Sequence, residues 1–161
     1  MIVVLMGVTG CGKTTVGALL AQDCGLAFRD ADDYHPAENV AKMKRGDALT
    51  DADRWPWLDR LNTLLRDSDR QGKSLVLACS ALKQAYRDRL ERDCAAVRFV
   101  LLDGDRELIR ARLAARRGHY MNPALLDSQF ATLEPPQDAL RVDAAGTPAE
   151  LVLQIRAALG V

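Results

Sequence analysis

The chain has 161 residues, of which 48% are hydrophobic and 27% are charged, so we expect one globular domain, residues 1–161, with a substantial core. Its 22 basic and 22 acidic residues cancel, which excludes a global field that would draw the protein to nucleic acid or to a membrane surface. No apolar run approaches the roughly 20 residues that a membrane-spanning helix needs.

The chain enters its first predicted strand at residues 2–6, with neither a cationic leader nor a cleavage site ahead of it. Its four cysteines form no C-x-x-C pair and no Cys/His pattern typical of a metal site. We therefore expect a reduced, cytoplasmic protein. The cysteines are Cys11, Cys24, Cys79 and Cys94.

The segment from Gly7 to Thr14 reads Gly-Val-Thr-Gly-Cys-Gly-Lys-Thr, directly after the apolar strand and at the start of a helical pattern. This is the phosphate-loop motif G-x-x-x-x-G-K-[ST] between a strand and a helix, a context that disfavours a chance glycine-rich turn. Glycines let successive N–H groups converge on an anion, and the helix N-terminus adds positive charge. Lys13 suits the β- and γ-phosphates, and Thr14 suits Mg²⁺. The predicted nucleotide-binding residues are Gly7, Val8, Thr9, Gly10, Cys11, Gly12, Lys13, Thr14 and Thr15.

Apolar strands alternate with amphipathic helices along the rest of the chain. Further strands are predicted at residues 26–29, 74–79, 97–102 and 140–142. The pattern predicts an α/β fold with about five parallel strands and helices on both faces. Helices are predicted from Thr14 to Gly25, Pro36 to Gly46, Leu58 to Gly72, Ala81 to Arg92, after Asp105, from Pro123, and from Thr147 to Leu159, with Pro56 breaking a turn capped by Thr50 and Asp53.

Acidic residues follow the second predicted strand in the pattern Asp30-x-Asp32-Asp33-x-His35. Ligands of parallel sheets bind at the carboxyl ends of the strands, so we expect this motif to face the phosphate loop from the neighbouring strand. Phosphoryl transfer uses one carboxylate near the metal and another that orients the accepting hydroxyl. The alternative is a solvated loop in which Asp33 caps the next helix and His35 only begins it.

Basic residues and aromatic residues come together in Arg54-Trp55-Pro56-Trp57. Ser80 and Lys83 follow the third long strand, from where they could reach an acceptor. A solvated basic face is the alternative for the cations, and core packing is the expected role of at least one tryptophan.

Arginines on successive helical turns lead into a glycine-containing connection, in the run from Arg110 to His119. This arrangement is typical of a small lid that covers phosphates and excludes competing water, and we place the lid at about residues 112–135. An exposed basic helix is the alternative. The residues concerned are Arg110, Arg112, Arg116, Arg117, Gly118 and His119.

Taken together, these motifs resemble those of the gluconate kinases (gluconokinases), small P-loop kinases related to shikimate and adenylate kinases. Beyond the phosphate loop, the resemblance rests on D-x-D-x-x-H at 30–35, D-R-x-P-W-L at 53–58, C-S-A-L-K at 79–83 and R-R-G-H-Y at 116–120. Cys11 stands where serine is usual and Tyr120 where phenylalanine is common. Both a small apolar filler and an unusually acidic, oxidation-prone thiol are open interpretations of Cys11.

The resemblance implies transfer of the ATP γ-phosphoryl group to the 6-hydroxyl of D-gluconate, with Mg²⁺ and in a homodimer. It implies that Asp30 lies near the metal with Thr14, and that Asp32 orients the acceptor hydroxyl. A kinase of another small acceptor, such as shikimate or a nucleoside monophosphate, and a regulatory module that binds nucleotide are the alternatives. By the same resemblance Lys13, Asp32 and Arg116 act in catalysis, Arg112 stacks on adenine, and Asp32, His35, Arg54, Lys83 and His119 surround the substrate, with Arg54 suited to its carboxylate.

Overall fold

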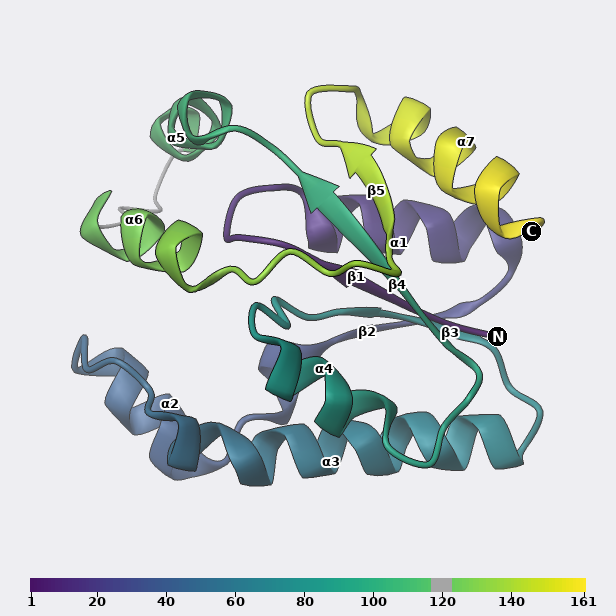
Figure 1. The fold of residues 1–161 in the computed structure, drawn as a ribbon, viewed down its shortest axis with the longest axis horizontal. Coiled ribbons are helices and arrows are strands. Elements are labelled where there is room, and N and C mark those ends of the chain that lie inside the picture. Colours follow the sequence, from purple (N-terminus) through teal and green to yellow (C-terminus); the bar gives the residue numbers. More distant parts are fainter. Residues whose placement is uncertain (117–122) are drawn as a thin grey trace.

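A computed structural model describes residues 1–116 and 123–161 of the chain. Five parallel strands form a single sheet in the order β2-β3-β1-β4-β5 (Figure 1). The predicted α/β fold with a five-stranded parallel sheet is therefore confirmed. The strands are β1 (Ile2–Met6), β2 (Ala27–Asp30), β3 (Leu75–Ala78), β4 (Val97–Asp103) and β5 (Leu140–Asp143).

The central strand β1 is buried along its whole length and divides the core into two parts. Because side chains alternate along a strand, Val3 and Leu5 point to one face of the sheet and Ile2, Val4 and Met6 to the other. Each set joins a separate hydrophobic cluster. This is why the strand reads as an unbroken apolar run in the sequence.

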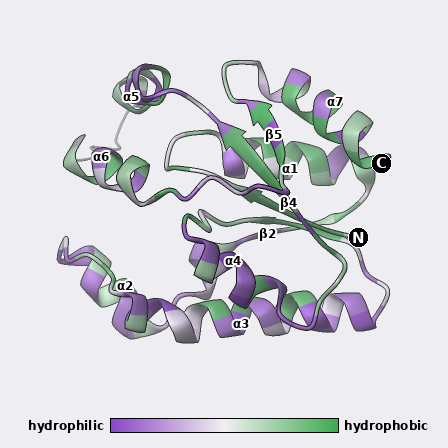
Figure 2. Ribbon diagram, viewed as in Figure 1, coloured by the Kyte–Doolittle hydropathy of each residue, from purple (hydrophilic) through white to green (hydrophobic). Residues whose placement is uncertain are grey.

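Helices cover both faces of the sheet (Figure 1). The cluster around Val3 and Leu5 includes residues of α1, α5 and α7, and the cluster around Val4 includes residues of α3 and α4. Figure 2 shows the hydrophobic colour along the strands and hydrophilic positions along α3 and α4. The helices are α1 (Lys13–Cys24), α2 (Ala37–Lys44), α3 (Asp51–Arg70), α4 (Gln84–Glu91), α5 (Arg106–Ala115), α6 (Pro123–Thr132) and α7 (Pro148–Leu159), with a short 3₁₀ helix, η1 (Ala31–Tyr34).

Two predicted boundaries were wrong. Pro56 does not break a turn but lies inside α3, which begins at Asp51. The ring costs α3 one backbone hydrogen bond, and the helix continues because Trp57 and Leu58 immediately bury their side chains in the core.

The helix predicted from Ala81 begins three residues later, at Gln84. Ala81 has a φ of 44°, in the left-handed region, so residues 81–83 form a turn after β3. The carbonyl groups of Ala81 and Leu82 accept hydrogen bonds from the Arg87 side chain, whereas that of Lys83 accepts them from the backbone N–H groups of Tyr86 and Arg87 in α4. In the part of the chain that the structure describes, no helix is both long and apolar enough to cross a bilayer.

Candidate active site

The phosphate loop connects β1 to α1 at the carboxyl edge of the sheet. Gly12 is the N-cap of α1 with a φ of 104°, a conformation that favours glycine. Gly10 allows a close approach of α5, since a Cβ atom there would lie 2.9 Å from the side chain of Leu113. The Lys13 ammonium group donates to the carbonyl oxygens of Gly7 and Val8, at 3.0 and 2.9 Å. The lysine is thus held at the loop, where it would bind phosphate together with the loop N–H groups.

The acidic motif reaches the phosphate loop, although not from a neighbouring strand as predicted. Strand β3 lies between β1 and β2, and the carbonyl of Ser80 accepts a hydrogen bond from the Gly7 N–H at 3.2 Å. The first turn of α1 spans the gap, because the Thr14 hydroxyl donates to the Asp30 carboxylate at 2.9 Å. The strand order is non-sequential, and such an order cannot be read from the spacing of motifs.

Thr14 and Asp30 together offer oxygen ligands of the kind that Mg²⁺ prefers. Among the described residues no group of three or more His, Cys, Asp or Glu side chains could hold a metal by itself. Mg²⁺ keeps several waters and binds to one or two protein groups plus the phosphates of a nucleotide.

Asp32 lies two residues beyond Asp30, whose second carboxylate oxygen accepts the Asp32 N–H at 3.1 Å. The Asp32 side chain is 88% exposed, yet the protein around it still displaces part of its hydration. This desolvation, and next the negative charge of Asp30, raise the pKa of Asp32, while the positive charge of Lys13 opposes the rise. A carboxylate with a raised pKa is a better acceptor for a proton from a hydroxyl group.

His35 follows η1, with only 5% of its side chain exposed. Its ring stacks on that of Trp57, with centroids 4.3 Å apart. Burial, and then the positive charge of Arg54, lower the pKa of His35. The expected core role of one tryptophan is confirmed by Trp57, whose indole N–H also donates to the Ala31 carbonyl at 2.7 Å.

Arg54 and Lys83 meet at a carboxylate that we did not predict, that of Asp51. Lys83 lies 3.2 Å from both Asp51 carboxylate oxygens, and the Tyr86 hydroxyl donates to the same group. The Arg54 guanidinium donates to the Leu49 carbonyl at 2.5 Å and lies over the Tyr86 ring, 5.6 Å from its centroid. Among the described residues, its Nε and second terminal nitrogen form no hydrogen bond. One edge of the guanidinium is therefore open for a carboxylate.

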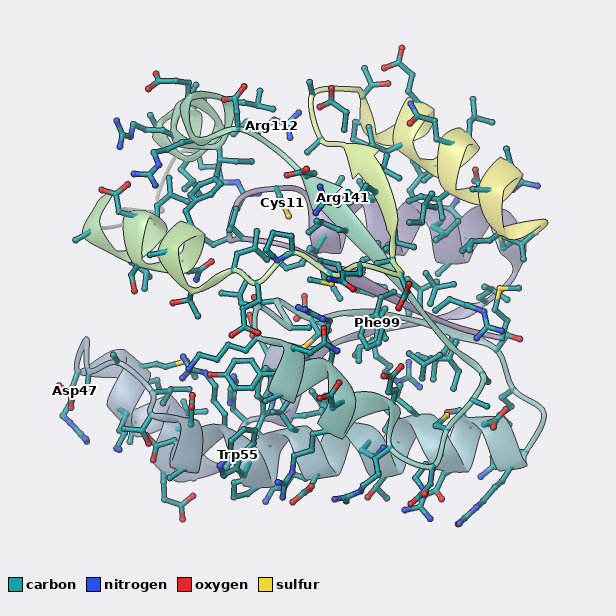
Figure 3. The ribbon with its side chains drawn as sticks, viewed as in Figure 1. Cys11, Asp47, Trp55, Phe99, Arg112 and Arg141 are labelled. Carbon is teal, nitrogen blue, oxygen red and sulfur yellow. The ribbon has the colours of Figure 1, made fainter. Side chains whose placement is uncertain are left out.

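The arginines of α5 have different surroundings. Arg110 pairs with Asp127 of α6, 3.5 Å away, and Arg106 pairs with the same carboxylate at 3.0 Å. Arg112 lies on α5 on the same side of the sheet as Cys11 of the loop (Figure 3), and Arg116 is the exposed C-cap residue of α5. Neither Arg112 nor Arg116 has an ion pair within residues 1–116 and 123–161. Arg117, Gly118 and His119 lie outside the described residues.

A buried arginine fixes the segment that leads from α6 back to the sheet. Arg87 is 1% exposed and donates to the carbonyl of Glu134 at 2.8 Å as well as to those of Ala81 and Leu82. The Glu134 N–H donates to the Leu82 carbonyl in return, at 2.8 Å. We call this arrangement the Arg87 clamp. It ties the base of α6 to the turn that carries Lys83.

Cys11 is completely buried and belongs to the core cluster beneath the loop. Its sulfur lies 3.9 Å from the Lys13 nitrogen. The structure favours the interpretation of Cys11 as an apolar filler, because a thiol without solvent access is shielded from reagents.

Comparison with known proteins agrees with this geometry. A family described as AAA domain matches residues 2–136. The chain is 48% identical to a probable gluconokinase of Xenopus tropicalis over 84% of this chain and 80% of the relative. It is 44% identical to the thermosensitive gluconokinase of Escherichia coli over 97% of this chain and 86% of the relative. The chain belongs to the gluconokinase family.

Solved structures place the fold in the same family. A gluconokinase from Sinorhizobium meliloti superposes with a TM-score of 0.88 at 41% identity, covering 98% of this chain and 90% of that one. A shikimate kinase from Aquifex aeolicus superposes with a TM-score of 0.63 at 17% identity, which shows a shared fold and no more. The chain is thus a P-loop kinase of the gluconokinase family.

Four features of the site were not predicted from the sequence. They are the side chains of Asn39, Asp51 and Gln129, and the role of Trp57 as a hydrogen-bond donor. Gln129 of α6 accepts the Thr9 N–H at 2.6 Å, and Asn39 contacts His35 at 3.3 Å. Asp51 lies beside the D-R-x-P-W-L motif at 53–58, but nothing in the spacing of Asn39, Asp51 or Gln129 indicates which partner each contacts.

Proposed function

We propose that this protein transfers the γ-phosphoryl group of ATP to the 6-hydroxyl of D-gluconate, giving 6-phospho-D-gluconate and ADP. The observation that carries the proposal is the convergence of Lys13, Thr14 and Asp30 at the phosphate loop, with Asp32 two residues beyond Asp30. Membership of the gluconokinase family is the reason for proposing D-gluconate as the acceptor.

The loop and its lysine bind the nucleotide. Lys13 leaves the carbonyls of Gly7 and Val8 for the β- and γ-phosphates, which offer a stronger, charge-assisted contact. Thr14 and Asp30 would hold Mg²⁺, which would supply positive charge against the negative charge of the phosphates.

Asp32 orients the acceptor hydroxyl for in-line attack and receives its proton, a role that suits a carboxylate with a raised pKa. The open edge of Arg54 binds the carboxylate of the substrate, and His35 and Lys83 bind its hydroxyl groups. Arg116 stabilises the transferring phosphoryl group, Arg112 stacks on adenine, and His119 completes the substrate site. Residues of about 112–135 act as a lid that excludes water.

A coupled assay of ADP release tests the function, with ATP, Mg²⁺ and either D-gluconate, shikimate or AMP. We expect turnover with gluconate alone. Turnover with shikimate or AMP would assign another acceptor, and nucleotide binding without any acceptor-dependent rate would favour the regulatory module. Replacement of Mg²⁺ by excess chelator should abolish the rate.

We further propose a cytoplasmic homodimer. The four cysteines are free, as a reducing compartment would keep them, and the family resemblance implies the dimer. Light scattering behind a sizing column measures the mass against 17.7 kDa for one chain. A single-chain mass at micromolar concentration would contradict the dimer.

A further inference from the structure

Asn39 is a buried polar residue whose amide nitrogen is fully engaged. It is 3% exposed, and its nitrogen donates to the Asp53 carbonyl at 2.9 Å. A carbonyl can only accept, so the nitrogen rather than the oxygen of the amide must face it. The second N–H of the same nitrogen faces Nδ1 of His35 at 3.3 Å. Nδ1 must therefore act as an acceptor, which leaves the proton of the neutral ring on Nε2.

The orientation of the imidazole is fixed by a second residue. The ring lies nearly parallel to that of Trp57, at an interplanar angle of 15°. The indole N–H of Trp57 is bonded to the Ala31 carbonyl, between Asp30 and Asp32 in the chain. His35 and the turn that carries Asp32 are thus held against one rigid side chain.

The free edge of His35 faces Asp32. Nε2 lies 3.9 Å from Oδ1 of Asp32, which is too long for a direct hydrogen bond. A hydroxyl oxygen could lie about 2.8 Å from both atoms. The Nε2···O···Oδ1 angle would then be about 90°, close to the angle between two hydrogen bonds at an alcohol oxygen. An alcohol donates one hydrogen bond and accepts others, so it can donate to Asp32 and accept from Nε2–H.

We propose that Asn39 is a positioning residue that keeps His35 in the Nε2–H form, so that His35 and Asp32 together receive one hydroxyl group of a polyhydroxy acid. The hydroxyl part of this inference rests on the proposed function; the tautomer does not.

Charged groups of both signs surround the imidazole. Asp32 faces it from η1 and Arg54 from α3, while on α2 the Lys42 ammonium is paired with Asp53 at 2.8 Å. Burial and Arg54 lower the pKa of His35, so the ring is neutral at pH 7.

Nitrogen NMR of imidazole-labelled protein tests the tautomer without substrate. His35 and His119 are the two histidines, so a His119→Gln sample assigns the resonances. We expect the Nε2–H form in the wild type, and in Asn39→Ala a mixture of tautomers with a higher His35 pKa. The Nδ1–H form in the wild type, or an unchanged spectrum in Asn39→Ala, would overturn the proposal.

A matched control separates positioning from stability. Asn62 is also a buried asparagine, 1% exposed, whose nitrogen donates to the carbonyls of Leu90 and Arg92 at 2.8 Å. Asn62→Ala should lower the melting temperature and leave the His35 resonances and the KM for gluconate as they are. Equal spectral changes in both variants would assign the effect of Asn39 to packing.

A double-mutant cycle tests the action on substrate. Asn39→Ala should raise the KM for gluconate roughly three- to tenfold, the range expected for one hydrogen bond, with little change in the KM for ATP. Glutamine at position 35 keeps an N–H near the place of Nε2, so Asn39→Ala should add nothing in the His35→Gln background. An equal effect in both backgrounds would refute positioning through His35. The expected tautomer in an enzyme that ignores gluconate would instead refute the proposed function.

Discussion

The backbone N–H of Thr9 in the phosphate loop donates to the side-chain oxygen of Gln129 at 2.6 Å, across 120 positions of the chain. The contact joins α6 to a loop whose N–H groups are expected to bind phosphate. Gln129 therefore occupies a donor for which the oxygens of ATP would compete.

Removal of this competitor should strengthen nucleotide binding. We expect Gln129→Ala to lower the Kd for ATP by about three- to tenfold, the value of one hydrogen bond, as measured by calorimetry without acceptor. Ser128→Ala is the control, because Ser128 is exposed on the same helix and its hydroxyl has no hydrogen bond in the described part of the chain. An unchanged Kd would mean that phosphate does not use the Thr9 N–H.

Lys13 should be essential for turnover. Lys13→Ala is expected to lower kcat by at least about 10²- to 10³-fold, because the transferring group loses its closest positive charge. Lys73→Ala, which removes an exposed lysine before β3, should retain full activity in the same coupled assay. Full activity of Lys13→Ala would refute the mechanism.

We expect the Asp32 carboxylate to lower the stability of the fold although activity depends on it. Its pKa in the folded protein is raised above 3.8, so the ionised carboxylate destabilises the fold at neutral pH, and this cost disappears as the pH falls below 3.8. Asp32→Asn should therefore raise the melting temperature at pH 7, and the gain should vanish near pH 3.

The same Asp32→Asn variant should lower kcat by about 10²- to 10⁴-fold with little change in the KM for ATP. Asp33→Asn, on the adjacent exposed carboxylate, should keep most of the activity. Loss of ATP binding in Asp32→Asn would move Asp32 to the metal and reverse the roles of the two aspartates.

Two equivalent capping boxes allow stability and substrate binding to be separated. Thr50 and Asp53 cap α3 beside the site, and Thr147 and Glu150 cap α7 away from it. Alanine at either threonine should cost about 1 kcal/mol of unfolding free energy in denaturant titrations. Only Thr50→Ala should also raise the KM for gluconate, because α3 carries Asp51 and Arg54. Equal KM values in the two variants would show that the α3 cap does not shape the acceptor site.

The pH dependence of the α3 cap has a defined sign. The Lys42 ammonium, and then the Thr50 N–H, lower the pKa of Asp53 to about 2. The stability that the ionised carboxylate contributes to the folded protein is therefore present above pH 3.8 and is lost as the pH falls toward 2. Asp53→Asn should lower the melting temperature at pH 7, and this difference should shrink over that window.

Local signals in the sequence predicted most of the elements correctly. The phosphate loop, the Thr50 and Thr147 caps and the apolar strands depend on residues that are close in the chain, so their patterns are visible there. The break predicted at Pro56 was wrong. A proline is a local signal for the end of a helix, whereas α3 continues because the next two side chains are buried in the core.

Long-range partners could not be predicted in the same way. The acidic motif was expected to face the phosphate loop, and Asp30 does contact Thr14, but the strand beside β1 is β3 rather than the predicted β2. Asn39, Asp51 and Gln129 contact residues whose proximity arises only from tertiary packing. Such contacts produce no periodicity and no characteristic spacing in the amino-acid sequence.

The Arg87 clamp limits how the α5–α6 pair can move. At one end the pair leaves the sheet after Asp103 of β4, and at the other it returns at Glu134, which Arg87 and Leu82 hold in place. Gln129 could therefore leave Thr9 while Glu134 stays attached, and the turn that carries Lys83 would keep its place.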